Sequence, residues 1–396
     1  MLSLDKVFNA QTVLKGIVRE TKPVRAYGIA PHCELYLKPE NLQITGSFKV
    51  RGSAYKIAML TDEEKEKGVI ACSAGNHAQG VALAATKNGI RSLICLPDSA
   101  PISKVEATKG YGAEVCLVEG CYDDAYAKAL ELRDREGYTF VHPFDDENVI
   151  AGQGTIALEI LNDLDSIDAI VVPIGGGGLI SGIAYTVKQI RPSVKVYGVQ
   201  AAGAPSMYNS VRDGEIECLP SVSTVADGIA VKQPGENTFR YVREYVDEIA
   251  LVTDDEVSSA ILALIEKQKM IAEGAGATAV AAVMFDKFDL KGKRVVAVVS
   301  GGNIDVTSLS RVIDRGLLKS GRSSSLLIEL IDKPGQLKEI SRIIADRGGN
   351  VTGVHYEKGN TESVNGCFLR IEMETRDFDH VTLITQALRD EGFRIR

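Results

Sequence analysis

The chain has 396 residues, a formal net charge of −8, and a composition that is 45% hydrophobic and 25% charged. This length allows two or three domains with ordinary buried cores, and the negative charge argues against a nucleic-acid partner. No apolar run reaches the roughly eighteen residues of a membrane span, and the first residues, MLSLDK, lack the layout of a signal peptide.

The cysteines and histidines show no pattern of a disulfide framework or a metal site. The seven cysteines, at 33, 72, 95, 116, 121, 218 and 367, form no C-x-x-C pair. Cys72, Cys95 and Cys116 lie in apolar runs, where cysteine is usually a small buried hydrophobic residue. The five histidines have no H-x-x-x-H spacing, so no zinc site is predicted. These cysteines are therefore predicted to be reduced thiols, and reduced thiols favour a cytoplasmic location.

Strand-like and helix-like segments alternate from about residue 68 to about residue 315. Short apolar runs predict strands at 68–72, 90–96, 114–119, 139–142, 169–174, 195–200 and 294–300. Amphipathic stretches between them, such as 81–87, 122–135 and 152–162, predict helices. This alternation is typical of an α/β fold with parallel sheets covered on both faces, in which ligands bind at the carboxyl ends of the strands.

The C-terminal part has a different pattern. Residues 316–325, GLLKSGRSSS, are mostly small and polar and predict a linker. After them the sequence predicts a strand at 326–331, a helix at 336–347, strands at 351–356 and 367–373, a helix at 379–389 and a final short strand. The order β-α-β-β-α-β is that of a ferredoxin-like unit.

Lys49 stands in an unusual setting, inside TGSFKVRG at residues 45–52. The small and flat neighbours of this lysine would allow close packing around a ring. Burial lowers the pKa of a lysine toward the neutral amine that imine formation requires. The segment therefore predicts a lysine that forms an imine with pyridoxal phosphate, although alone it would also fit a solvated lysine at a helix end.

Three glycine-containing turns follow predicted strands. SAGNH at 73–77 opens a helix, whose first N–H groups bind anions such as a carboxylate. GGGG at 175–178 lets several N–H groups converge on a phosphate, and SGGN at 300–303 places Ser300 where it could face a ring nitrogen. No lysine follows the four glycines, which disfavours a nucleoside triphosphate. Each turn alone would also serve as an ordinary connection.

Together and in this order, the four motifs resemble those of the fold-type II pyridoxal-phosphate enzymes of the threonine/serine dehydratase family. The resemblance covers about residues 10–315 and includes VIAGQGT at 149–155 and ADG at 226–228. It implies a catalytic domain at 1–315 with two parallel-sheet α/β subdomains, the smaller at about 45–145. After the linker at 316–325, the tail at 326–396 resembles an ACT regulatory domain, with DKPGQL at 332–337 as its opening.

The resemblance also implies a role for each motif residue. Lys49 would be the catalytic residue and would hold pyridoxal 5′-phosphate. The remaining cofactor contacts would come from Phe48, Asn76, Gly175, Gly176, Gly177, Gly178 and Ser300. The substrate carboxylate would be bound by Ser73, Ala74, Gly75, Asn76 and His77.

The implied reaction is β-elimination of L-threonine, and of L-serine, to a 2-oxo acid and ammonia. A serine racemase is the nearest alternative, but members that racemise carry serine where Ala74 stands, and Ala74 cannot transfer a proton. Gln200 and Ser206 replace carboxylates of the related divalent-cation site, so no such metal is expected, whereas a monovalent ion is left open. A non-catalytic amino-acid sensor is a remote alternative, because Lys49 and Ser300 are intact.

The ACT-like tail allows two functions. By family analogy it would bind an effector, isoleucine or valine, at Asp332, Gly335 and Asn350. Gly335 would let the ligand approach the backbone, and Asn350 would reach across from the next strand. Alternatively, the tail would serve assembly alone. A homodimer or homotetramer is expected, and the sequence does not separate a biosynthetic from a catabolic role.

Overall fold

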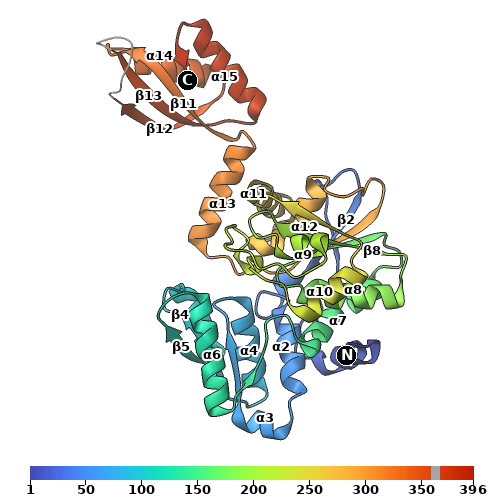
Figure 1. Ribbon diagram of the computed structural model, residues 1–396. Helices are drawn as coiled ribbons and strands as arrows, with labels where there is room; N and C mark the ends of the chain where they lie inside the picture. Colours follow the sequence, from blue (N-terminus) through green and yellow to red (C-terminus); the bar gives the residue numbers. More distant parts are fainter. Residues whose placement is uncertain (358–365) are drawn as a thin grey trace. The chain divides into compact units, whose positions relative to one another are not determined.

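The computed structural model describes residues 1–357 and 366–396. The chain divides into two compact units, Met1–Leu309 and Ser310–Arg396, each with its own sheets and helices (Figure 1). The first contains two largely parallel sheets and the second an antiparallel one, so the predicted fold class is confirmed. Among the described residues, no helix combines the length and the apolar character that crossing a membrane requires.

The larger sheet of the first unit has the strand order β1-β2-β10-β7-β8-β9. Its strands are β1 (Val24–Arg25), β2 (Glu34–Pro39), β7 (Ala169–Pro173), β8 (Lys195–Ala201), β9 (Glu248–Val252) and β10 (Arg294–Val299). All neighbours run parallel except β1 and β2. Strand β7, AIVVP, is buried at every residue, as expected of a strand covered on both faces.

Seven α-helices accompany this sheet: α1 (Leu4–Leu14), α7 (Glu147–Asp163), α8 (Gly178–Ile190), α9 (Ser206–Asp213), α10 (Glu236–Tyr245), α11 (Asp254–Ala263) and α12 (Gly274–Met284). Three short helical turns are η1 (Glu40–Leu42), η2 (Asp227–Ile229) and η3 (Leu264–Gln268). Helix α12 consists of small residues and packs on β7, β8 and β10. Helix α7 begins where the Asp146 carboxylate accepts hydrogen bonds from the N–H groups of Asn148 and Val149.

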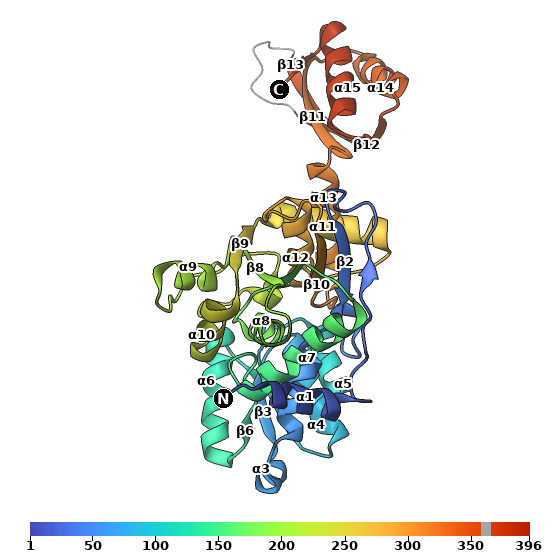
Figure 2. The same cartoon turned by 90° about the vertical axis from the view of Figure 1, so that its right-hand side faces the viewer.

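The smaller sheet, β5-β4-β3-β6, is parallel throughout. Its strands are β3 (Val69–Cys72), β4 (Ser92–Pro97), β5 (Glu114–Val118) and β6 (Thr139–Phe140), and its helices are α2 (Lys49–Ala58), α3 (Asp62–Lys67), α4 (Asn76–Lys87), α5 (Ile102–Gly110) and α6 (Tyr122–Glu136). Val69 and Ala71 pack in the core that includes α4, whereas Ile70 and Cys72 pack with α6. Figure 2 shows α4 and α6 on either side of this sheet.

The second unit has the predicted β-α-β-β-α-β order. Its strands are β11 (Ser323–Ile331), β12 (Asn350–Glu357), β13 (Gly366–Glu374) and β14 (Arg394–Ile395), in the spatial order β12-β13-β11-β14, and its helices are α14 (Gln336–Asp346) and α15 (Phe378–Asp390). The core joins both helices to the sheet through apolar residues that include Ile328, Ile340, Ile344, Ile371 and Ile384.

Two expectations from the sequence differ from the structure. The stretch predicted as a linker, 316–325, is mostly regular, because α13 (Val306–Lys319) extends through residue 319 and Ser323 already pairs with Glu374 in the sheet. The division between the units falls after Leu309 rather than after residue 315. Strands β1, β2 and β9 were not predicted, and in β2 the buried Lys38 interrupts the apolar run.

Candidate active site

The four motifs meet at one cavity of about 1100 Å³ in the first unit. It is lined by the turns that follow β3, β7 and β10 and by the start of α2. Every residue predicted to contact the cofactor or the substrate carboxylate lines it: Phe48, Lys49, Ser73, Ala74, Gly75, Asn76, His77, Gly175, Gly176, Gly177, Gly178 and Ser300. The cavity therefore lies at the carboxyl ends of parallel strands, as the α/β pattern predicts.

Lys49 is the first residue of α2 and is half-buried. Its Nζ donates a hydrogen bond to the carbonyl oxygen of Pro143 at 2.7 Å and lies 5.4 Å from the centre of the Phe48 ring. Burial lowers the pKa of the Lys49 amine to about 8, and the negative charge of Glu273 limits this shift. A much larger share of neutral amine is thus present near neutral pH than for a solvated lysine.

The four glycines connect β7 to α8 and let the backbone pack closely against its neighbours, where side chains would not fit. Gly177 has φ +98°, a left-handed conformation that favours glycine. A Cβ on Gly176 would lie 2.5 Å from the Phe144 ring, and a Cβ on Gly178 would lie 2.8 Å from the Phe144 carbonyl oxygen. The loop ends at the N-terminus of α8, where backbone N–H groups bind anions.

The turn after β3 presents Asn76 as the first residue of α4. The Asn76 Nδ2 donates to Glu273 Oε1 at 2.7 Å, and the Asn76 Oδ1 accepts from Asn303 Nδ2 at 2.7 Å. These two bonds fix the orientation of the amide and use only one of its two N–H groups. The Ser73 hydroxyl oxygen accepts from the N–H of Gly75 at 3.1 Å. The turn is thereby held in a defined shape at the cavity wall.

His77 has a structural side chain. Its Nε2 lies 2.8 Å from the carbonyl oxygen of Val141, and its Nδ1 lies 3.5 Å from the Ser53 hydroxyl. Burial and then the nearby Lys49 charge lower the pKa of His77 to about 3, so the imidazole is neutral. His77 could therefore contact the substrate carboxylate through its backbone N–H, but not through its side chain.

Ser300 ends β10 beside the start of α2. Its hydroxyl donates to the carbonyl oxygen of Ala275 at 3.4 Å, a long bond that a ligand could replace. Its own carbonyl oxygen accepts from the N–H of Phe48 at 3.1 Å. Ser300 therefore supplies a neutral hydroxyl to the cavity and also anchors the segment that carries Lys49.

Glu273 is a cavity residue that the sequence analysis missed. It lies just before α12, is 6% exposed, and accepts the hydrogen bond from Asn76 described above. Burial, followed by the charge of Asp227, raises the pKa of Glu273 to about 7. The only sequence signal is a glutamate directly before the run GAGATA, and this signal has no fixed spacing to the other motifs.

Two ion pairs join elements of the smaller sheet to elements of the larger one at the cavity. Lys104 of α5 lies 3.1 Å from Asp227 of η2, and Lys232 lies 3.0 Å from Asp123 of α6. All four residues line the cavity. All are partly solvent-exposed, so the pairs contribute little stability, and they can separate at small cost when ligands enter.

The residues predicted to bind an effector do not lie together within one chain. Asn350 begins β12 and aligns with Ser323, at one end of β11, because both pair with Glu374. Asp332 and Gly335 follow the opposite end of β11, and eight residue steps of strand correspond to roughly 26 Å. The expectation that Asn350 reaches across to Gly335 is therefore wrong for a single chain; a shared site would need two chains.

A family model described as pyridoxal-phosphate dependent enzyme matches residues 14–301. The chain belongs to this family. An L-threonine ammonia-lyase of Thermotoga maritima is 48% identical, and one of Geobacter sulfurreducens is 43% identical, each over 100% of this chain and 99% of the relative.

Solved structures agree with this assignment. A tomato threonine deaminase has a TM-score of 0.76 at 38% identity, covering 80% of this chain and 90% of that one. Maize serine racemase has a TM-score of 0.75 at 34% identity, covering 80% and 98%. The fold thus does not by itself separate elimination from racemisation.

The cavity fits the cofactor of this family, pyridoxal phosphate. The glycine loop packs against Phe144 more closely than residues with a Cβ could, lines the cavity, and ends at a helix N-terminus. Lys49 is a half-buried amine with a lowered pKa in the same cavity. These are the two features that the cofactor requires, a phosphate site and a lysine nucleophile.

Proposed function

We propose that this protein is an L-threonine ammonia-lyase that also accepts L-serine and converts them to 2-oxobutanoate or pyruvate and ammonia. The observation that carries the proposal is Lys49, a half-buried amine with a pKa lowered to about 8 that shares one cavity with the glycine loop and the Asn76 turn. The full-length similarity to proteins named L-threonine ammonia-lyase supports the choice of threonine.

Different cavity residues would bind different parts of the cofactor and of the substrate. Lys49 holds the cofactor covalently, the backbone N–H groups of Gly175–Gly178 hold its phosphate, and Phe48 flanks the ring. The N–H of Asn76 that Glu273 leaves unused would bind the ring oxygen, and Ser300 would bind the ring nitrogen. The N–H groups of the turn from Ser73 to His77 bind the substrate carboxylate at the start of α4.

The protein's part in the reaction is to hold the substrate and move protons. When bound, pyridoxal phosphate withdraws electrons from the α-carbon of the amino acid. With the cofactor bound, the free amine of Lys49 would take the α-proton as a general base. The β-hydroxyl would leave as water by taking up a proton from Lys49, and the released enamine would hydrolyse to the 2-oxo acid and ammonia. Ser300 is a neutral partner for the ring nitrogen, which favours elimination over transamination.

The cavity also bears on the racemase alternative. Racemisation needs a second proton carrier on the other face of the α-carbon. Ala74 lines the cavity but has no proton to give, while His77 has a pKa near 3 and hydrogen-bonds to Val141. We therefore propose elimination as the main reaction. Serine racemase activity at a rate similar to threonine turnover would contradict this choice.

A direct assay tests the proposal. Purified protein loaded with pyridoxal phosphate is given L-threonine, L-serine or D-serine, and the 2-oxo acid is followed by its absorbance. We expect turnover of L-threonine and L-serine, with ammonia released in equal amount. The Lys49→Ala variant should lose the turnover and the visible band of the bound cofactor, whereas Lys109→Ala, on the exposed face of α5, should keep both. A wild-type protein without 2-oxo acid formation would refute the proposal.

We further propose that residues 1–315 form the catalytic part, with the smaller subdomain at about 45–145, and that residues 326–396 form an ACT-like regulatory part. Isoleucine or valine would bind between the ACT-like parts of two chains, because Asn350 lies at the opposite end of β11 from Gly335. The assembly would be a homodimer or homotetramer. Either amino acid should shift threonine kinetics or the thermal midpoint; if neither does, the C-terminal part serves assembly alone.

A further inference from the structure

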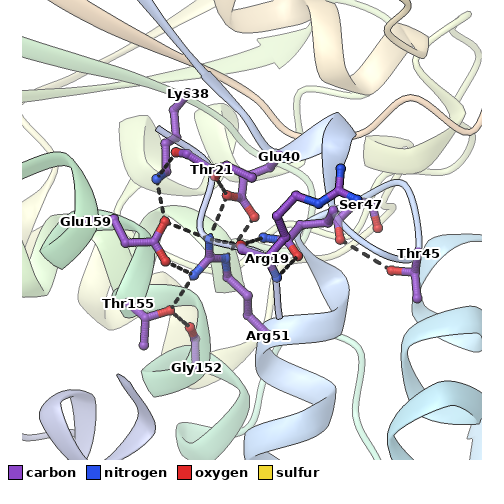
Figure 3. Close-up of polar contacts among 11 residues, drawn as sticks. Arg19, Thr21, Lys38, Glu40, Thr45, Ser47, Arg51, Gly152, Thr155 and Glu159 are labelled. Atoms are coloured by element: carbon purple, nitrogen blue, oxygen red, sulfur yellow. Dashed lines mark hydrogen bonds and ion pairs between the residues drawn. The ribbon is translucent and has the colours of Figure 1, made fainter. Parts of the chain in front are cut away.

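A buried cluster of charges surrounds Arg51, two residues after Lys49 (Figure 3). The Arg51 guanidinium binds two carboxylates in a bidentate manner. Its Nε and Nη2 each lie 2.8 Å from the oxygens of Glu40, and its Nη1 and Nη2 lie 2.6 and 2.8 Å from those of Glu159. Nη1 also donates to the Thr155 hydroxyl at 3.1 Å. All five N–H donors of the guanidinium are therefore used.

Lys38 completes the cluster. Its Nζ donates to Glu159 and to the carbonyl oxygen of Thr21, and the Thr21 hydroxyl donates to Glu40. Two cations thus face two carboxylates, so the cluster is electrically balanced. The side chains of Lys38, Glu40 and Arg51 are at most 1% exposed, and that of Glu159 is 11% exposed. Because desolvation offsets most of the attraction in such a cluster, stability alone does not account for it.

The cluster joins three elements around the first turn of α2. Arg51 comes from that turn, Lys38 and Glu40 come from β2 and η1, and Glu159 comes from α7. A Cβ on Gly152 would lie 2.7 Å from the Arg51 carbonyl oxygen, so α7 touches the backbone of α2 at this level. Rotation or sliding of the first turn would break several charged hydrogen bonds at once.

Lys49 is held from both sides by these contacts. Before it, the N–H of Phe48 donates to the Ser300 carbonyl at 3.1 Å, and Ser47 pairs with Gly301 at the end of β10. After it, the N–H of Arg51 donates to the Phe48 carbonyl at 3.0 Å, and the guanidinium enters the cluster. The backbone of Lys49 therefore has fixed points one residue before and two residues after it.

We propose that Arg51 is a positioning residue that sets where Lys49 Nζ lies in the active-site cavity. The proposal rests on the proposed role of Lys49. Arg51 is not among the described residues that line that cavity; it lines a second cavity of about 580 Å³ together with Thr155, Glu159 and residues of the segment 11–20. It therefore acts through the first turn of α2 rather than by contact with the substrate.

The second cavity makes the proposal testable by chemical rescue. It opens onto the Arg51 and Glu159 side chains, so a small cation can reach the space that a truncated Arg51 leaves. The guanidinium ion has the same planar set of donors as the arginine side chain. Added guanidinium should refill the cluster in Arg51→Ala but cannot restore the covalent link to α2.

The experiment compares holoenzymes of the wild type, Arg51→Lys and Arg51→Ala. The readouts are kcat and KM for L-threonine, the visible absorbance band per bound cofactor, and the thermal midpoint. A small misplacement of a catalytic group lowers the rate of the chemical step. We therefore expect kcat to fall about 10- to 100-fold, with KM changed less than about threefold. The absorbance band should weaken or shift in both variants. Millimolar guanidinium chloride should restore part of the band and of kcat in Arg51→Ala only.

Lys188→Met is the matched control, because it removes an ion pair with Asp247 at 2.6 Å in the last turn of α8. It should lower the thermal midpoint without changing kcat or the band. If the Arg51 variants behave like this control, the positioning role is wrong. If Arg51→Ala does not fold, Arg51→Lys and Glu159→Gln decide by the same readouts. A wild type that does not turn over threonine would refute the proposed function, while the absorbance band would still test Arg51.

Discussion

Burial of Lys49 has a measurable cost in the cofactor-free protein. Its pKa is about 8 in the folded protein against 10.5 when solvated. A difference of 2.5 in pKa corresponds to about 3 kcal/mol, at about 1.4 kcal/mol per factor of ten. The folded pKa is lowered, so the charged amine destabilises the fold at pH values below 8. This cost disappears as the pH rises from 8 to 10.5, where the unfolded chain also loses the proton.

The substitution Lys49→Met removes this cost in the cofactor-free protein. It also removes the hydrogen bond to the partly buried carbonyl oxygen of Pro143, which costs about 1 kcal/mol. The variant should then be more stable than the wild type by about 2 kcal/mol at pH 7, as the difference of these two effects. This advantage should be lost by about pH 10.5.

Urea denaturation followed by circular dichroism at pH 7, 8, 9 and 10 measures this difference directly. Lys67→Met, on the exposed helix α3, is the control and should differ from the wild type by a constant amount. The reasoning would be refuted by a Lys49→Met advantage that stays the same across this pH range.

Two further substitutions test other parts of the site. Glu273 has its folded pKa raised from 4.5 to about 7, so the fold loses stability as pH rises from about 4.5 to about 7; Glu273→Gln should flatten the fall in thermal midpoint over this range, and an unchanged slope would show that this carboxyl does not titrate there. Gly176→Ala would bring a Cβ to 2.5 Å from the Phe144 ring, so titration with pyridoxal phosphate should give at least about tenfold weaker binding; wild-type affinity would exclude the glycine loop as the phosphate site.

The parts of this fold that the sequence predicts are those with a local signal. The parallel strands appear as apolar runs, and the four motifs lie at their ends because small residues are needed where backbone must approach a ligand closely. Strand β2 was missed because its Lys38 reads as a surface residue, although the cluster around Arg51 buries it. A local pattern cannot show that charges from four separate elements will neutralise one another.

The same limit explains the two errors of detail in the sites. Glu273 accepts a hydrogen bond from Asn76, which lies 197 positions away in the sequence. Nothing in the sequence near either residue indicates this contact. The expectation that Asn350 reaches across to Gly335 came from analogy with ACT domains. The strand register, which no local pattern reveals, places them at opposite ends of the sheet. The sequence therefore predicts local elements and motifs, but not which distant segments pair with one another.

The central claim is that Lys49 holds the cofactor. Reduction of the holoenzyme with sodium borohydride fixes the bound cofactor on its lysine, and mass spectrometry of the peptides then identifies that residue. The added mass should lie on Lys49 alone. Two other lysines, Lys104 and Lys232, line the same cavity; the added mass on either of them, with Lys49 unmodified, would contradict the account.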